Sequence, residues 1–443
     1  MILIGSAKHV RMINCNLKNR DFSLAKNIIE TQDAINQIKL MHKPNSTKEI
    51  LIVVDNSGEI DAITLDLIKD KSKKSKLDKY EVVKTQKYNP KIIYQDNSPW
   101  SVDCQYPYII IGSNNRTVFV FNYEDEENNA QEINNLNNNN ILNNNSVIYN
   151  GNNNNIPYVT ISDNGSFIGN NSIDKSFKIF DFYTGDLICS CVNPNSDWGW
   201  GVKFVPQNLF KIRDFTFKTM EKRIEENAIC NALISLKMSD LNITNPSQFD
   251  ENNYNTIPYE DLNTYEKYIK INLIDKYYIL STTNHSAGLF KLDYKIENNK
   301  KKVIVVPLGK IELNRNYIRD LYMENQQLDY VSLLMAKGIN QCSRYEFLFY
   351  SKNMNLLLFG SKAGDLQVVE MNIYHDKKNK LIGMEDEPNV IISFGEKLAG
   401  MKFIENNDES GRKIIDIFVL TLSGMFYYYK IMPEFNTLNI YNN

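Results

Sequence analysis

Residues 356–369 read LLLFGSKAGDLQVV: an apolar run, a small polar turn and a second apolar run. Such runs are typical of β-strands, and Ala363, Gly364 and Asp365 are the small residues that a tight reversal needs. The segment therefore predicts a β-hairpin. Its first strand is apolar on both faces, which predicts a strand sandwiched between two layers. The second strand alternates more, which predicts a position nearer the rim.

This pattern recurs along the whole chain. Six further segments repeat it, at residues 2–13, 50–65, 108–121, 167–181, 278–292 and 417–429. Most are spaced by about 50 to 60 residues, slightly more than a plain WD40 repeat. One such unit cannot bury both of its faces, whereas a ring of units can. We therefore predict an all-β fold, a WD40-like β-propeller of seven blades that spans residues 1–443. The alternative is a pair of unrelated β-sandwiches.

Two segments interrupt the repeats. Residues 124–155 are acidic and then rich in Asn, a composition that cannot bury enough apolar surface to fold, so we expect a disordered loop within the propeller. Residues 207–272 form a longer gap, which predicts an insertion between blades. Within that gap, residues 217–226 have a helical pattern, and Asn-, Asp- and Tyr-rich loop sequence follows.

Composition narrows the class of protein. The net charge is −3 and the pI is near 6.0, so direct binding to nucleic acid is not expected. The six cysteines are scattered, which is typical of reduced thiols in a cytosolic or nuclear protein. The N-terminus lacks the basic start and apolar core of a signal peptide, and no apolar run has the length of a membrane helix.

The sequence carries no recognisable catalytic motif. The four histidines are isolated in sequence, and the chain has no nucleophile-elbow motif, phosphate-binding Gly-Lys loop or zinc-protease motif. We therefore expect no enzymatic activity, no cofactor and no metal. A further hypothesis, ranked third, is catalysis by acidic side chains in a central channel.

The candidate partner-binding residues are the three tryptophans: Trp100, Trp198 and Trp200. Trp198 and Trp200 flank Gly199, so in an extended segment their side chains would point the same way. One interpretation is packing between blades; the other is an aromatic anchor for a partner, since Trp is enriched at binding hot spots.

A second candidate is a basic loop, whose lysines are Lys71, Lys73, Lys74 and Lys76. It is interpreted either as a solvated surface loop or as a nuclear address or phosphate contact.

Several segments resemble a known family. Residues 97–102 leading to 108–114, residues 155–159, Ser172-Ile173-Asp174, Ile179-Phe180-Asp181 and residues 197–201 resemble the fungal WD40-like repressors of ribonucleotide-reductase genes, the constitutive ribonucleotide-reductase transcription regulators. The resemblance is specific over about residues 90–210. Two features depart from the pattern: Phe180-Asp181 replaces the Trp-Asp dipeptide, and no Arg follows two residues later.

The resemblance implies a regulatory adaptor of the nucleus and cytoplasm that acts in repression of these genes and in the DNA-damage response. It also implies substrate-receptor attachment to a cullin ubiquitin ligase through a propeller adaptor. The expected partners are proteins, namely that adaptor or transcription factors, and we expect the chain to be a monomer within a larger complex. The alternative is a noncatalytic propeller subunit of an RNA-modifying complex.

Overall fold

The structure is a computed structural model. It describes the chain except residues 1, 14, 17–20, 23–25, 69–78, 89–97, 125–145, 215–275, 285, 298–299, 314–343, 376–380, 385–389, 395, 409, 433–437 and 442–443. The chain divides into two compact units, residues 1–174 with 178–187, and residues 175–177 with 188–443.

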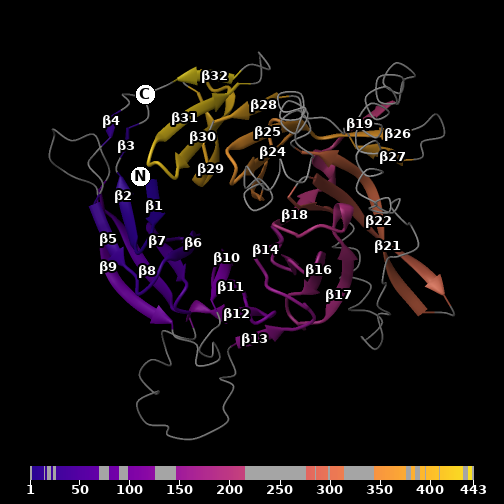
Figure 1. Ribbon diagram of the computed structural model, residues 1–443, viewed down its shortest axis with the longest axis horizontal. Helices are drawn as coiled ribbons and strands as arrows, with labels where there is room; N and C mark the ends of the chain where they lie inside the picture. Colours follow the sequence, from indigo (N-terminus) through magenta and orange to yellow (C-terminus); the bar gives the residue numbers. More distant parts are fainter. Residues whose placement is uncertain are drawn as a thin grey trace, which may run out of the picture. The chain divides into compact units, whose positions relative to one another are not determined.

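Nearly all regular structure in the described residues is β (Figure 1). The N-terminal part contains a three-stranded sheet, β1 (Ile2–Ser6), β2 (His9–Ile13) and β5 (Lys26–Glu30), and a two-stranded one, β3 (Cys15–Asn16) and β4 (Asp21–Phe22). Three antiparallel sheets follow in chain order: β6 (Ile35–His42), β7 (Lys48–Asp55), β8 (Ile60–Ile68) and β9 (Lys79–Tyr88); β10 (Pro99–Gln105), β11 (Tyr108–Ser113), β12 (Val118–Asn122) and β13 (Ser146–Tyr149); β14 (Tyr158–Ile161), β15 (Phe167–Asn171), β16 (Ser176–Asp181) and β17 (Leu187–Val192).

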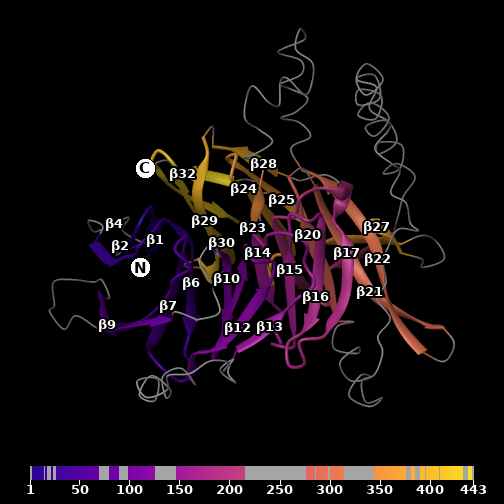
Figure 2. The ribbon, with the colours of Figure 1, turned by 60° about the horizontal axis from the view of Figure 1, so that its bottom comes forward.

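Three further four-stranded sheets complete the series. They are β18 (Gly201–Pro206), β20 (Tyr277–Thr282), β21 (Ser286–Glu297) and β22 (Lys300–Glu312); β23 (Tyr345–Tyr350), β24 (Leu356–Ser361), β25 (Asp365–Glu370) and β28 (Val390–Ser393); β29 (Leu398–Asn407), β30 (Lys413–Thr421), β31 (Phe426–Ile431) and β32 (Leu438–Tyr441). The long β21–β22 hairpin is visible in Figure 1 and Figure 2. Two 3-10 turns, η2 (Pro194–Ser196) and η3 (Gln207–Leu209), flank β18.

All seven predicted hairpins are present as neighbouring strands: β1–β2, β7–β8, β11–β12, β15–β16, β20–β21, β24–β25 and β30–β31. Each is completed into a sheet by flanking strands, mostly as an up-and-down order of four, which is the blade of a β-propeller. The chain therefore has the predicted all-β, WD40-like propeller fold. The number of blades and the extent of one propeller over residues 1–443 stay predictions.

The sandwiching of first strands is confirmed in β7. Its residues point alternately to opposite faces. Ile50 and Ile52 pack against the sheet of β10–β13, whereas Leu51 and Val53 pack with Val10 of β2 and with neighbouring apolar residues. The strand is thus apolar on both sides because it has a sheet on each side.

The alternation that placed the second strand nearer the rim does not reflect exposure in β25. Its residues are buried from Asp365 to Val369, and Gln367 has no exposed surface. The reason is a further strand beyond it: Gln367 is opposite Ile391 of β28. The amide of Gln367 donates to the Tyr345 hydroxyl at 2.9 Å, so the polar residue that made the strand alternate has a buried partner.

The two interruptions differ from their predicted boundaries. The end of the predicted Asn-rich loop is ordered: residues 146–149 form β13, which pairs with β12, and Tyr149 is fully buried. Residues 125–145 lie outside the described residues. The segment 207–272 is not between blades, because β18 and β20 on either side of it pair within one sheet. Its expected helical stretch, 217–226, also lies outside the described residues.

The start of this insertion forms a sheet of its own. β19 (Lys211–Asp214) pairs in parallel with β26 (Asn372–His375), which pairs antiparallel with β27 (Leu381–Met384). β26 and β27 lie in the chain between β25 and β28. Two insertions into different four-stranded sheets thus meet in one three-stranded sheet.

In the described part of the chain, no helix has the length and apolar character that would let it cross a membrane.

Candidate functional site

Trp198 and Trp200 lie in the loop before β18. Their rings meet edge to face, with centroids 6.4 Å apart and an interplanar angle of 71°. Trp200 is buried at 3% exposure, whereas Trp198 is 43% exposed. Each sequence interpretation therefore describes one residue: Trp200 is a packing residue, and Trp198 presents an aromatic surface.

Trp200 is held by two hydrogen bonds. Its backbone N–H donates to the carbonyl of Thr282 at 2.9 Å, and its indole Nε1 donates to Oδ1 of Asn284 at 2.6 Å. Asn284 lies in the turn between β20 and β21 and is 6% exposed. Because the indole needs a buried acceptor, this turn fixes the plane of the ring.

The same amide also fixes the loop that carries Trp198. Nδ2 of Asn284 donates to Oδ1 of Asp197 at 3.2 Å, and the backbone N–H of Trp198 donates to the same oxygen at 2.7 Å. A continuous path of hydrogen bonds therefore joins Trp200, Asn284, Asp197 and the backbone of Trp198. The exposed ring stands on a support with a defined geometry.

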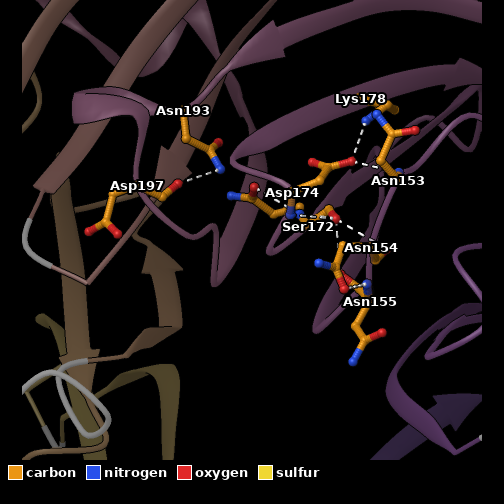
Figure 3. Close-up of polar contacts among 9 residues, drawn as sticks. Asn153, Asn154, Asn155, Ser172, Asp174, Lys178, Asn193 and Asp197 are labelled. Atoms are coloured by element: carbon orange, nitrogen blue, oxygen red, sulfur yellow. Dashed lines mark hydrogen bonds and ion pairs between the residues drawn. The ribbon is translucent and has the colours of Figure 1, made fainter. Parts of the chain in front are cut away.

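Asn193 anchors the other end of the loop. Its Nδ2 donates to the carbonyl of Asp197 at 3.3 Å, as Figure 3 shows, and its Oδ1 accepts from the Ser281 hydroxyl at 2.9 Å. Pro194 packs on Gly288, where an added Cβ would lie only 2.6 Å from Cγ of the proline. The loop is thus fixed against the sheet of β18–β22 before any partner binds.

Arg344, directly before β23, stacks on this arrangement. Its guanidinium carbon is 4.2 Å from the centroid of the Trp200 ring. Nε is buried, and within the described ranges it has no hydrogen-bond partner and no carboxylate forms an ion pair with the guanidinium. A cation over an indole face is worth about 0.5–2 kcal/mol. The contact with the Trp200 ring therefore holds the guanidinium in position but does not neutralise its positive charge.

Lys362, a basic residue hydrogen-bonded to the backbone of Arg344, has an ion-pair partner. Lys362 donates its backbone N–H to the carbonyl of Arg344 at 3.0 Å, but its ammonium is paired with Glu346 at 3.1 Å. Within the site, Arg344 is thus the cation without an ion-pair partner among the described residues. We call Trp198, Trp200 and Arg344 the Trp–Arg site.

Sequence reasoning found two of these three residues. Arg344 and the supporting Asn284 were missed, because each is an isolated polar residue far along the chain from the tryptophans, and no local motif marks either. Trp100, the third predicted tryptophan, lies in the other compact unit, half-buried in β10 where the register shifts between Pro99 and Ser101. The basic-loop residues Lys71, Lys73, Lys74 and Lys76 lie outside the described residues.

The Ser-Ile-Asp segment of the family resemblance closes a turn (Figure 3). The Ser172 hydroxyl donates to the carbonyl of Asn155 at 3.0 Å. Oδ2 of Asp174 accepts from the backbone of Asn153 at 2.8 Å and from Nζ of Lys178 at 3.2 Å. Both charged side chains are almost fully buried. Burial lowers the pKa of Lys178, and the opposite charge of Asp174 counteracts that shift.

A metal-binding group or a cysteine would be another kind of candidate site in the described part of the chain. Those residues contain no group of three or more His, Cys, Asp or Glu side chains that could hold a metal ion. Cys104, Cys189 and Cys191 are free thiols.

No protein-family model and no curated protein matches the chain. Solved structures with a similar architecture include Sqt1 of Saccharomyces cerevisiae, at 8% identity and a TM-score of 0.45, over 98% of this chain and 79% of that one. A chain of the mitotic checkpoint complex matches at 8% identity and a TM-score of 0.47, over 97% and 83%. The WD40 β-propeller domain of Doa1 matches at 9% and 0.47, over 98% and 89%. The propeller fold of this chain rests on its own successive sheets.

Proposed function

We propose that the protein is a noncatalytic scaffold that binds a protein partner through the Trp–Arg site. The observation that carries this proposal is the exposed ring of Trp198 on a buried, hydrogen-bonded support. Trp and Arg are enriched among the residues that dominate binding energy, and a pre-organised loop loses little entropy when a partner binds.

The proposed context follows from the family resemblance. It is regulation of ribonucleotide-reductase genes and the DNA-damage response, in the nucleus and cytoplasm, with attachment to a cullin ubiquitin ligase as a substrate receptor. Two of the residues that carry the resemblance, Ser172 and Asp174, stabilise a turn and so concern the structure of the blade. Residues 197–201 also carry the resemblance, and they contain Trp198 and Trp200 of the Trp–Arg site. This segment therefore connects the family resemblance with the proposed partner binding.

The test is affinity purification of the tagged chain from its own cells, with mass spectrometry of the proteins that copurify. We expect Trp198→Ala to lose a specific partner. Tyr183→Ala is the matched control, because Tyr183 is an exposed aromatic residue in a different turn. The thermal unfolding midpoint of each variant shows whether the fold is kept.

The outcomes separate the parts of the proposal. A cullin, its adaptor or chromatin-linked factors among the lost partners would support the regulatory context. An unchanged set of partners in a folded Trp198→Ala variant would refute the Trp–Arg site as the binding surface.

The alternative is a noncatalytic subunit of an RNA-modifying complex, motivated by the basic loop at 71–76. It predicts RNA binding that weakens with salt and falls when Lys71, Lys73, Lys74 and Lys76 are changed to Gln. Copurification of an RNA-modifying enzyme would favour it over the regulatory context.

A further inference from the structure

We propose that Arg344 binds a carboxylate of an acidic peptide segment, in which an Asp or Glu stands close to a large apolar residue that packs on Trp198. This inference rests on the proposed function, because it assigns the chemistry of the partner at the same site.

The guanidinium carbon of Arg344 lies over the Trp200 ring, and a guanidinium on an aromatic face can still donate hydrogen bonds from the N–H groups at its edge. Those groups match the two oxygens of a carboxylate, and such charge-assisted pairs are among the strongest hydrogen bonds in proteins. Arg stays charged at all physiological pH values, so the site is permanently cationic.

Nε of Arg344 is shielded from solvent and has no hydrogen-bond acceptor among the described residues. A buried donor without an acceptor is unfavourable, and proteins rarely retain one. A carboxylate that displaces the atoms covering Nε would supply the acceptor.

The two acidic residues of the site have other partners. Oδ1 of Asp197 already accepts from Asn284 and from the backbone of Trp198. Glu346 is paired with Lys362. Among the described residues no acid pairs with Arg344, so charge complementarity points to an acidic partner.

An apolar surface adjoins the guanidinium. Trp198 and Arg344 both contact the same indole, that of Trp200. One short peptide segment can therefore reach the exposed ring with an apolar side chain and the guanidinium with a neighbouring acid. The motif that we infer is a Leu or Phe within a few residues of a Glu or Asp.

The experiment uses the purified full chain and immobilised short peptides. Each peptide carries Leu or Phe at varied spacing from one Glu, and its matched control has Gln in place of Glu. We expect the wild type to prefer some Glu peptides by about 10- to 100-fold, the range for a charge-assisted hydrogen bond. Arg344→Gln should abolish this preference, and Arg344→Lys should keep part of it. Unfolding midpoints confirm that each variant is folded.

Each contrary outcome is informative. Equal binding of Glu and Gln peptides, or no peptide preferred in its Glu form, overturns the carboxylate site. If Trp198→Ala nevertheless loses its cellular partner, the proposed function survives that failure. Stronger binding of peptides with phosphoserine in place of Glu overturns the carboxylate assignment and points to a phosphate. If Trp198→Ala also keeps every cellular partner, both proposals fail.

Discussion

Lys178 is a buried cation and Arg344 a half-buried one, and their surroundings differ in the acid that pairs with them. Lys178 is 5% exposed and is paired with Asp174 at 3.2 Å, inside a turn whose backbone is tied to the same carboxylate. Arg344 is held on the face of an indole, with no acid of the described residues as a partner. The difference teaches that a neutralised cation belongs to the framework of the fold, whereas a cation placed without its acid is available to another molecule.

The largest effect that would sharpen this comparison comes from removing the acid at Lys178. We expect Asp174→Asn to lower the free energy of unfolding by about 3–5 kcal/mol, because it removes the carboxylate paired with a buried ammonium. Urea unfolding measures the change. The double variant with Lys178→Met should recover most of the loss, since the buried ammonium is then gone as well. Asp66→Asn, at the more exposed Lys48–Asp66 pair, should cost less than about 1 kcal/mol. Equal losses at the two pairs would contradict the framework role of Lys178.

A smaller effect is expected at the support of the Trp–Arg site. Trp200→Phe removes the indole N–H that Oδ1 of Asn284 accepts, so a buried acceptor loses its donor. We expect a loss of about 1–3 kcal/mol in the free energy of unfolding. Trp198→Phe, at the exposed ring, is the control and should change it by less than about 0.5 kcal/mol. If the exposed residue proved the more important of the two for stability, the assignment of support and binding surface would be reversed.

A still smaller change in stability is expected for Arg344→Gln. The lost cation–π contact is partly offset by removing a buried donor without an acceptor, so the net change should stay within about 1 kcal/mol. Chemical unfolding and the peptide assay should therefore give different results for this variant. Its preference for Glu peptides should be lost, whereas its free energy of unfolding should be nearly unchanged. A loss of stability as large as that of Asp174→Asn would break the comparison, because Arg344 would then be part of the framework.

The smallest effect is a dependence on pH. Burial lowers the pKa of Lys178 from its ordinary value of 10.5, so the folded protein holds this proton less tightly than the unfolded chain. The contribution of Lys178 to stability therefore rises with pH between the lowered pKa and 10.5, where the unfolded chain binds more protons. The difference in unfolding free energy between wild type and Lys178→Met should grow over this window. A flat difference would mean that Asp174 fully compensates for the burial. Arg344→Gln should show no such dependence, because Arg does not titrate there.

The sequence predicts the blades well and the site only in part. Hairpins such as 356–369 are local: two apolar runs and a turn are adjacent in the chain, so pattern alone identifies them. The predicted boundaries of elements are wrong where a strand pairs with a segment that is distant in the sequence. Ser146–Tyr149 was assigned to the Asn-rich loop because nothing near it indicates that it pairs with β12. Gln367 makes the 365–369 strand alternate although it is buried, because its hydrogen-bond partner, the Tyr345 hydroxyl, comes from another strand.

The same limit applies to the Trp–Arg site. The aromatic pair is visible in the sequence as two tryptophans around one glycine, yet the sequence does not tell which ring is exposed. That distinction depends on Asn284, which captures the indole of Trp200. Arg344 reaches the site through the packing of sheets and leaves no local pattern. Contacts between residues distant in the chain, which decide the chemistry here, are what a single sequence does not display.

The small sheet of β19, β26 and β27 has a consequence for how the molecule opens. β19 belongs to the chain that interrupts the sheet of β18–β22, and β26 belongs to the chain that interrupts the sheet of β23–β28. Their parallel pairing links two insertions, so the two sheets cannot separate from each other until β19 and β26 come apart. Local opening is cooperative within linked elements. We therefore expect the two sheets to open together, with hydrogen exchange of their central strands coupled through the β19–β26 pairing.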